Sequence, residues 1–203
     1  KITRWNMGIQ QFLELVLPDS GAKIIALATP TGKGGVWFKY KKYDSAKDAA
    51  LAAEFFDDQG ETVYFAVNSF GDWYDDERKK KKRIRTQETV VAFRSLFDDF
   101  DVGGDGKKKY ATREEALADI VQLAKVLQLT PTITSSGGGY HCYFSLDEDV
   151  TSDVWKELSA LKRDVTTHMG LKADRAVDMD SARILRPVGT HNRKTNPPVE
   201  VKL

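Results

Sequence analysis

The chain has 203 residues, of which 41% are hydrophobic and 30% charged, and its formal net charge is +1. Such a chain should fold around a hydrophobic core as one large domain or two small ones. The single cysteine, Cys142, excludes a disulfide framework and a cysteine-based zinc module, and it suggests a reducing compartment. The sequence has neither an apolar run of about 18 residues nor a signal-peptide pattern, so no membrane partner is expected. Because it begins with Lys1 and not methionine, we expect a fragment of a longer protein.

Residues 1–90 are expected to form an α/β unit. Pro18 ends an apolar helical repeat, and Ser45 is placed to cap a later helix, with Asp48 three residues further on. The loop at residues 30–35 lacks the G-x-x-x-x-G-K-[ST] spacing of a phosphate-binding loop and is interpreted as a hairpin connection. Periodicity and residue type predict a helix at 8–17, strands at 23–29, 36–40 and 62–67, and a helix at 46–58.

Basic residues are concentrated in runs. Seven of the eight residues from Arg78 to Arg85 are basic, and Lys107–Lys109 form a second run after Asp101. Side chains with this much charge cannot pack in a core, so one alternative is a solvated loop. The other alternative is an electrostatic guide for a nucleic-acid backbone, because each neutralised phosphate releases counterions.

Residues 91–203 are also predicted to contain strands and helices, and hairpin-joined strands argue against a purely parallel sheet. A capping box from Thr112 to Glu115 should open a helix. The expected elements are strands at 95–102, 130–134, 140–146, 174–177 and 199–203, a turn at 103–106, and a helix at 151–168. The side chains expected to face inward are Leu117, Ile120, Val121, Ala124 and Leu127 on the first helix, and Val154, Leu158, Leu161 and Val165 on the second.

Asp99 and Asp101 are two residues apart on a predicted strand, so their carboxylates should point to the same face with Cα atoms about 7 Å apart. Two adjacent carboxylates with little water repel each other, and a divalent cation with oxygen ligands such as Mg²⁺ relieves the repulsion. The apolar residues around them make a merely solvated acidic surface less favourable. Asp98 falls on the opposite face with Leu96 and Phe100, and the sequence offers no reason for an acid there.

Three glycines, Gly137–Gly139, precede an alternating aromatic run that contains His141. Glycine accepts backbone angles barred to other residues and allows a ligand to approach the main chain. In the strand that follows, His141 and Tyr143 should share one face. Free backbone N–H groups beside an imidazole suit an anion such as a phosphate. The alternative is a simple hairpin turn with a half-buried histidine.

The third polar stretch runs from Asp174 to Lys194 and places acids before bases. In such a segment the acids can bind a metal ion and the bases can bind the phosphates beside it. Arg183 and Arg186 would share a helix face at this spacing. The alternative is an ordinary charged helix and loop.

Taken together, these stretches resemble the three motifs of the archaeo-eukaryotic primase superfamily, and most closely the primase-polymerases of phages, plasmids and other mobile elements. The resemblance covers about residues 95–195. The matching patterns are D-x-D at Asp99–Asp101, S-G-x-G-x-H at Ser136–His141, D-x-x-V at Asp174–Val177, R-x-x-R at Arg183–Arg186 and G-T-x-N-x-K at Gly189–Lys194.

The resemblance implies a role for each matching residue. Asp99, Asp101 and Asp174 would hold the metal, with Asp178 and Asp180 as rivals for the third position. His141 would join them as a catalytic residue that, with the arginines, neutralises charge on the phosphates. The residues expected to bind the nucleotide are Ser136, Gly137, Gly139, His141, Arg183, Arg186, Asn192 and Lys194.

The resemblance further implies an α/β fold of 1–203 as a single catalytic domain. The fold would have a mixed sheet. Its C-terminal half, at about residues 91–203, would resemble an RNA-recognition motif (RRM-like) and pack on an N-terminal α/β unit at about residues 1–90. The expected activity is template-directed nucleotidyl transfer with two Mg²⁺ or Mn²⁺ ions, a DNA template and primer, and NTP or dNTP. A fused or partner helicase and a cytoplasmic location, in a bacterial, archaeal or phage-infected cell, are also implied. The alternatives are a non-catalytic module that binds single-stranded nucleic acid, and a metal-dependent nuclease.

Overall fold

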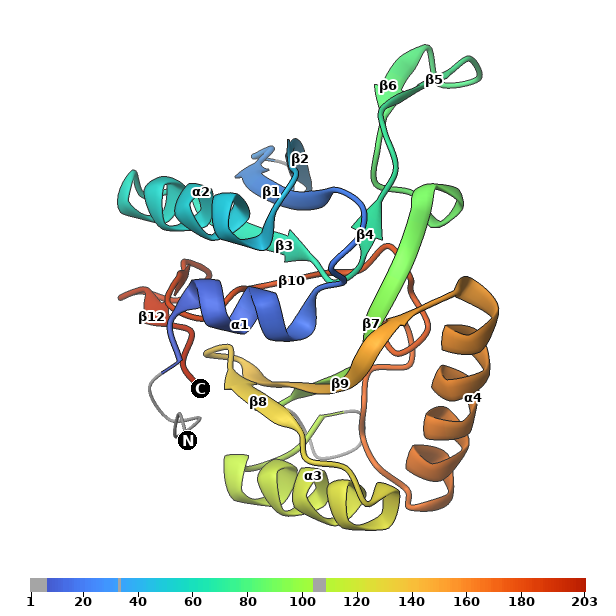
Figure 1. Ribbon diagram of the computed structural model, residues 1–203. Helices are drawn as coiled ribbons and strands as arrows, with labels where there is room; N and C mark the ends of the chain where they lie inside the picture. The colour runs from blue at the N-terminus through green and yellow to red at the C-terminus, as the bar shows by residue number, and fades with distance from the viewer. Residues whose placement is uncertain (1–6, 33, 104–108) are drawn as a thin grey trace.

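The computed structural model describes residues 7–32, 34–103 and 109–203, which form an α/β fold (Figure 1). The helices in this part of the chain are α1 (Ile9–Val16), α2 (Ala46–Asp58), α3 (Arg113–Leu127) and α4 (Ser152–His168), with a 3-10 turn at Gln87–Thr89. The longer strands are β1 (Lys23–Pro30), β2 (Val36–Tyr43), β3 (Thr62–Ala66), β7 (Val90–Asp101), β8 (Thr132–Ser135) and β9 (Gly139–Val150). The short strands are β4 (Ser69–Phe70), β5 (Tyr74–Asp76), β6 (Lys81–Arg83), β10 (Ile184–Leu185), β11 (His191–Asn192) and β12 (Val199–Glu200).

Two four-stranded sheets form the framework. The first has the order β10-β3-β1-β2 and the second the order β4-β7-β9-β8, and the paired strands in both are antiparallel. The α/β class is therefore confirmed, as is the expectation that the strands are not purely parallel. Each sheet also contains a strand from the other half of the chain, because β4 lies in the second sheet and β10 in the first. The RRM-like organisation and the single domain over 1–203 stay predictions.

The first sheet is covered on one face by α2 (Figure 1). The Ser45 hydroxyl accepts a hydrogen bond from the Asp48 backbone N–H at 3.0 Å, which confirms the predicted cap of this helix. Alternate residues on β1 and β3, including Leu27, Val63 and Phe65, are buried in the main core. The predicted hairpin across residues 30–35 is also confirmed, because β1 and β2 pair along their whole length.

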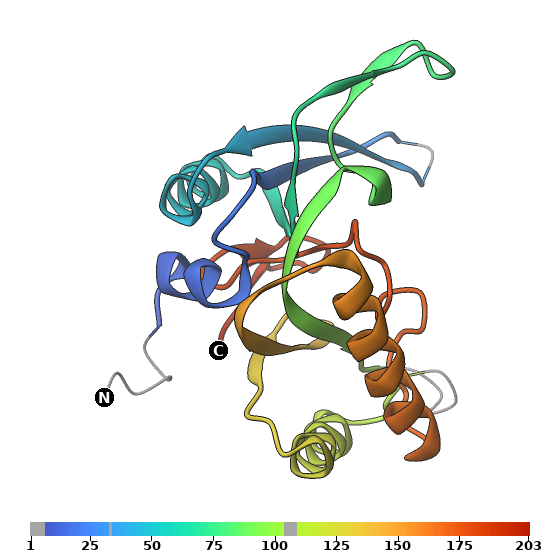
Figure 2. The same ribbon diagram turned by 45° about the vertical axis from the view of Figure 1, so that its right-hand side comes forward.

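The second sheet carries α3 and α4, and α1 lies between the two sheets (Figures 1 and 2). Phe12 of α1 shows why one core serves both sheets. Its ring contacts Phe65 of the first sheet at 5.6 Å and Tyr143 of the second at 5.4 Å between centroids. Strand β7 begins at Val90 rather than Ser95, and β9 continues to Val150, so the two strands at the centre of this sheet are longer than expected.

The inward faces predicted for the helices of the second half are confirmed in part: Ala124, Leu127, Leu158 and Val165 are partly buried and pack against the main core. On α4, Val154 and Leu161 are exposed, and the side chains buried instead are Trp155, Ser159, Lys162 and Thr166. On α3, Ile120 is buried as expected, but Leu117 and Val121 are exposed and Ala116 and Leu123 take their place. Apolar spacing mis-oriented α4 because its buried face is partly polar, and the partners of its polar groups lie far away in the sequence.

That polar face explains Asp98, the acid for which the sequence offers no reason. Asp98 points toward α4, where the Lys162 ammonium forms an ion pair with its carboxylate and donates a hydrogen bond to the Phe97 carbonyl at 2.9 Å. Both side chains are almost fully buried. Nearby, the Trp155 indole N–H donates to the Ser95 carbonyl at 3.0 Å. These contacts fix α4 against β7, the strand that carries Asp99 and Asp101.

Two further local predictions are wrong. Residues 174–177 form a turn and not a strand, because the Val177 N–H donates to the Asp174 carbonyl within the segment. Arg183 and Arg186 do not share a helix face, since they flank the two-residue strand β10. Most of the basic run from Arg78 lies in the turn and second strand of a hairpin, β5–β6, that projects from the body as an arm (Figure 2). No helix in the described part of the chain is long and apolar enough to span a membrane.

Candidate active site

The pairing of β7 with β9 brings two of the sequence patterns together. In this antiparallel ladder Asp99 lies directly opposite His141, and Asp101 lies opposite Gly139. Directly opposed residues point to the same face of a sheet, so the two acids and the imidazole share one surface. The His141 Nε2 atom lies 4.0 Å from a carboxylate oxygen of Asp99. Gly139 is required here, because a β-carbon on residue 139 would overlap the Phe100 carbonyl oxygen.

Asp174 joins these residues from a distant part of the chain. Its backbone N–H donates to the Asp99 carbonyl at 2.9 Å, which ties the 174–177 turn to the end of β7. The rival Asp178 is fully buried and engaged by Arg163 and Arg175. The other rival, Asp180, accepts a hydrogen bond from the Ala182 N–H at 3.1 Å. Of the three, Asp174 is the acid whose side chain lines the same cavity as Asp99 and Asp101.

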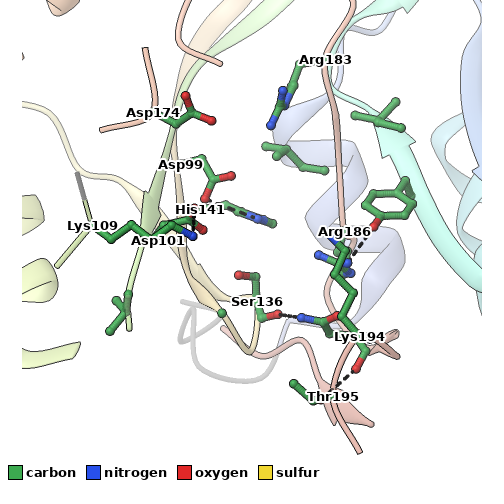
Figure 3. A pocket seen from close by; sticks show the side chains of 16 residues that line it. Asp99, Asp101, Lys109, Ser136, His141, Asp174, Arg183, Arg186, Lys194 and Thr195 are labelled. Carbon is green, nitrogen blue, oxygen red and sulfur yellow. Dashed lines mark hydrogen bonds and ion pairs between the residues drawn. The ribbon is translucent and has the colours of Figure 1, made fainter. Parts of the chain in front are cut away.

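The acidic wall faces a basic wall across this cavity. Figure 3 shows Asp99, Asp101 and Asp174 on one side and Arg183 and Arg186 on the other. The cavity has a volume of about 410 Å³. Its lining residues are Tyr64, Asp99, Asp101, Val102, Lys109, Ser136, Gly138, His141, Asp174, Arg183, Ile184, Leu185, Arg186, Asn192, Lys194 and Thr195.

The basic wall has unused hydrogen-bonding capacity. The Nε atoms of Arg183 and Arg186 are both buried without a hydrogen-bond partner among the described residues. The Arg186 guanidinium lies over the Tyr64 ring, 4.7 Å from its centroid, and donates to the Tyr64 hydroxyl at 2.6 Å. A buried donor without a partner is costly, so an anion in the cavity would satisfy groups that the protein leaves unpaired.

The glycine turn is held at one end of the cavity by the segment that contains Asn192. The Asn192 amide donates to the Ser136 carbonyl at 2.7 Å, and its oxygen accepts from the Lys194 backbone N–H at 3.1 Å. Gly137 adopts a positive φ of 84°, which favours glycine. Ser136, Lys194 and Asn192 line the cavity, whereas Gly137 and Gly139 shape the turn without lining it.

This segment is in turn anchored to α2 through Asp57. The Asp57 carboxylate accepts hydrogen bonds from the His191 N–H at 2.9 Å and from the Arg193 guanidinium. Burial acts to raise the pKa of Asp57, but the hydrogen bonds from Arg193 and His191 outweigh it and keep the pKa below its usual value. A charged anchor on the first sheet's helix therefore positions the Asn192 segment of the site.

Two groups at the acidic wall have strongly shifted pKa values. Burial, followed by the negative charges of Asp101 and Asp174, raises the pKa of Asp99 to about 7, while Arg183 acts in the opposite direction. Burial, with smaller contributions from Arg186 and Arg183, lowers the pKa of His141 to about 3 despite the nearby Asp99. His141 is thus a neutral imidazole at pH 7, which makes it a hydrogen-bonding group rather than the fixed positive charge that the motif suggests.

The acidic wall fits a divalent cation by its chemistry. Carboxylate oxygens are the ligands preferred by Mg²⁺ and Mn²⁺. Burial, and after it the neighbouring acids, disfavours the ionised form of Asp99, and a bound cation would stabilise that form. The Lys109 ammonium, 2.9 Å from an Asp101 oxygen, supplies some of that positive charge. Within the described residues, no three His, Cys, Asp or Glu side chains are already close enough to form a metal-binding group.

Sequence reasoning missed Tyr64 and did not assign Lys109 or Thr195 to a site, although all three line the cavity. Tyr64 comes from the first 90 residues, where no motif is recognisable. The available signal was the alternation Val63-Tyr64-Phe65, which places a polar-tipped ring on the opposite face from two core residues. Lys109 follows a segment, residues 104–108, that contains part of the second basic run and the predicted turn and lies outside the described residues.

Comparisons with known proteins address the fold. No protein-family model matches the sequence, and neither does any curated protein. Among solved structures, the AEP domain of the cyanophage S-2L primase-polymerase matches with a TM-score of 0.55 and 14% identity, over 90% of this chain and 81% of that one. The catalytic domain of the primase RepB′, in complex with initiator DNA, matches with a TM-score of 0.53 and 15% identity, over 96% and 83% of the two chains.

A third match is the polymerase domain of Mycobacterium tuberculosis ligase D in complex with DNA, with a TM-score of 0.51 and 15% identity, over 89% of this chain and 71% of that one. At identities this low the similarity concerns the fold. The chain has the fold of the archaeo-eukaryotic primase-polymerases, which confirms the resemblance of the sequence patterns at the level of the fold.

Proposed function

We propose that the chain is the catalytic domain of a template-directed nucleotidyltransferase, a primase-polymerase. The observation that carries the proposal is the single cavity lined by Asp99, Asp101 and Asp174 on one wall and by Arg183 and Arg186 on the other. These acids and bases come from separate parts of the sequence, and the fold is that of known primase-polymerases. Such a cavity suits a metal-bound polyphosphate, which needs oxygen ligands on its metal and positive charge around its phosphates.

The proposed reaction joins the 3′-oxygen of a primer to the α-phosphorus of a nucleoside triphosphate, with pyrophosphate leaving. Mg²⁺ or Mn²⁺ held by Asp99, Asp101 and Asp174 would make the 3′-hydroxyl a better nucleophile and stabilise the leaving pyrophosphate. Arg183 and Arg186 would bind the phosphates and stabilise charge that develops on them, a main source of catalysis in phosphoryl transfer.

The remaining side chains would orient the nucleotide. The Tyr143 hydroxyl lies 3.5 Å from the Nδ1 atom of the neutral His141. We propose the tautomer in which Nδ1 accepts a hydrogen bond from this hydroxyl and Nε2 carries the proton on the cavity side. From there it would donate a hydrogen bond to a phosphate oxygen. Ser136 and Lys194 border the cavity beside the glycine turn, where they would contact the phosphate tail. Asn192 acts mainly by fixing that turn, since both ends of its amide are engaged by the backbone.

Primer extension on a DNA template with Mg²⁺ or Mn²⁺ tests this function. We expect the chain to lengthen a labelled primer in a template-dependent manner, and the double variant Asp99→Ala/Asp101→Ala to lose this activity. A suitable control is Asp147→Ala, which removes an exposed acid at the distal end of β9 and should leave extension intact. Parental activity in the double variant would refute the assignment.

The same assay separates the alternatives. Metal-dependent shortening of the primer without extension would identify a nuclease. Metal-independent binding of single strands, with neither extension nor shortening, would identify a non-catalytic binding module. The matched structures are named as primases and polymerases, which favours nucleotidyl transfer over both.

A further inference from the structure

The face of the first sheet that lies away from α2 carries a row of aromatic side chains. In the register of this sheet, Ala26 on β1 lies opposite Tyr40 on β2 and opposite Tyr64 on β3. Ala28, further along β1, lies opposite Phe38. Small residues on the central strand thus form the floor, and larger rings rise from the strands on either side. We call Phe38, Tyr40 and Tyr64 the aromatic row.

The rings of the aromatic row contact one another. Phe38 and Tyr40 are nearly parallel, with an interplanar angle of 13° and centroids 6.3 Å apart. Phe38 and Tyr64 meet edge to face with centroids 5.9 Å apart. Phe38 is 36% exposed, and Tyr40 and Tyr64 are half-buried, so ring surface remains accessible to a ligand. Val36, on the same face at the end of β2, extends this accessible apolar surface.

The aromatic row connects two basic regions. At one end Tyr64 lines the candidate active-site cavity and bonds to Arg186. At the other end the Arg85 guanidinium lies 5.0 Å from the centroid of the Tyr40 ring and donates to the Tyr40 hydroxyl at 2.8 Å. Arg85 closely follows the hairpin β5–β6, which projects from the body (Figure 2). The row therefore leads from the cavity to the base of this arm.

The arm itself is strongly basic. Residues 74–83, which we call the basic arm, contain six basic and three acidic side chains. One of the acids, Asp76, is paired with Arg83 at 2.8 Å, and the lysines from Lys79 to Lys82 are exposed without an ion-pair partner among the described residues. Such a surface attracts a polyanion, and the aromatic row beside it offers flat rings at the same time.

We propose that the aromatic row and the basic arm form a binding track for a single-stranded nucleic acid that leads into the active-site cavity. Exposed bases stack on aromatic rings whatever their identity, and basic side chains along the path bind the phosphates. In a double helix the faces of the bases are stacked on one another, so a duplex could bind the basic arm through its phosphates but could not stack on the aromatic row. Identifying the bound strand as the template rests on the proposed function, whereas binding of a single strand does not.

Fluorescence anisotropy with a labelled oligothymidylate, measured in EDTA, tests the track apart from any catalysis. The variant Phe38→Ala/Tyr40→Ala should bind at least about tenfold more weakly, because each stacked base contributes strongly to affinity. Tyr40→Phe keeps the ring and should bind within about threefold of the parent. The matched control is Phe55→Ala, which removes an exposed ring from α2 on the other side of the sheet.

The basic arm is tested through the salt dependence of the same binding. The slope of log K against log salt is negative, and the variant Lys81→Gln/Lys82→Gln should make it less steep by ~0.7 for each phosphate of a single strand that the lysines neutralise in the parent. Lys125→Gln/Lys156→Gln, on the exposed faces of α3 and α4, should leave the slope unchanged. The aromatic variant should weaken affinity while preserving the slope, because stacking releases no counterions. The charge variant alters exposed side chains and remains informative if the aromatic variant folds poorly.

The outcomes separate this inference from the proposed function. Asp99→Ala/Asp101→Ala should abolish extension and retain oligothymidylate binding. A parent protein that binds oligothymidylate through the track but does not extend a primer would contradict the proposed function and leave the track intact. Parental affinity in the aromatic variant, or an unchanged slope in the lysine variant, would overturn the track even if extension is observed. Equal affinity of the parent for a duplex of the same length would also overturn it.

Discussion

The substitution Asp99→Asn should stabilise the metal-free protein at neutral pH. The usual pKa of an aspartate is 3.8, and in this structure burial and neighbouring acids raise that of Asp99 to about 7. Between these values the folded state binds more protons than the unfolded state, so stability falls as the pH rises through this window. The shift of about three units corresponds to a loss of about 4 kcal/mol, of which more than half falls between pH 5 and pH 8. An amide at residue 99 removes this penalty, since it does not ionise.

Urea unfolding of both proteins in EDTA, from pH 5 to pH 8, measures the difference. We expect the free energy of unfolding of Asp99→Asn to exceed that of the parent by a margin that grows toward pH 8. In a second series with Mn²⁺ in place of EDTA, the parent should be the more stable of the two proteins at pH 8. The ion stabilises the folded state to which it binds, and Asp99→Asn has lost one of the carboxylates that would hold it. The control Asp147→Asn removes an exposed acid and should follow the parent in both conditions. A constant margin across this pH range, or equal stabilisation of the parent and Asp99→Asn by Mn²⁺, would contradict the reasoning.

Three further predictions concern residues that position the site. Lys162→Met leaves Asp98 buried without its ion-pair partner and should lower the free energy of unfolding, measured in urea, by about 3–5 kcal/mol. The double variant Asp98→Asn/Lys162→Met should recover most of this loss. A loss below about 1 kcal/mol in Lys162→Met would show that the pair is unimportant. Gly139→Ala forces β9 away from the Phe100 carbonyl, so it should lower the free energy of unfolding by about 1–3 kcal/mol and abolish the stabilisation by Mn²⁺. Gly138→Ala meets no atom within 4 Å and should be tolerated. Equal thermal melts of the two variants would contradict this. Asp57→Asn weakens the hold on His191 and Arg193, so it should raise the KM for the nucleotide more than it lowers kcat in primer extension, and an unchanged KM would argue against the anchor.

Much of the site could be predicted from short patterns in the sequence. The spacing of Asp99 and Asp101 places both on one face of a strand, and the glycines before His141 predict a turn. The register that sets Asp99 against His141 could not be derived in this way, because it depends on how the two strands slide past each other. Asp174 was separable from Asp178 only by resemblance, and the structure shows the physical difference: Asp178 is engaged by arginines.

The misplaced face of α4 has a similar cause. Apolar periodicity favoured Val154 and Leu161, but Lys162 is buried because Asp98, more than sixty residues earlier in the chain, pairs with it. A partner that distant leaves no local trace in the sequence. Tyr64 was missed for the same reason, since its partner Arg186 lies beside a strand that joins the first sheet from the other half of the chain.

The most direct measurement is anomalous diffraction from a crystal of the protein with Mn²⁺ and a non-hydrolysable nucleoside triphosphate. The account predicts manganese peaks bound by Asp99 and Asp101, with Asp174 at the same centre. It also predicts triphosphate density that reaches the Nε atoms of Arg183 and Arg186 and the Nε2 atom of His141. Manganese bound elsewhere, or a triphosphate that leaves both arginines without an anionic partner, would contradict it.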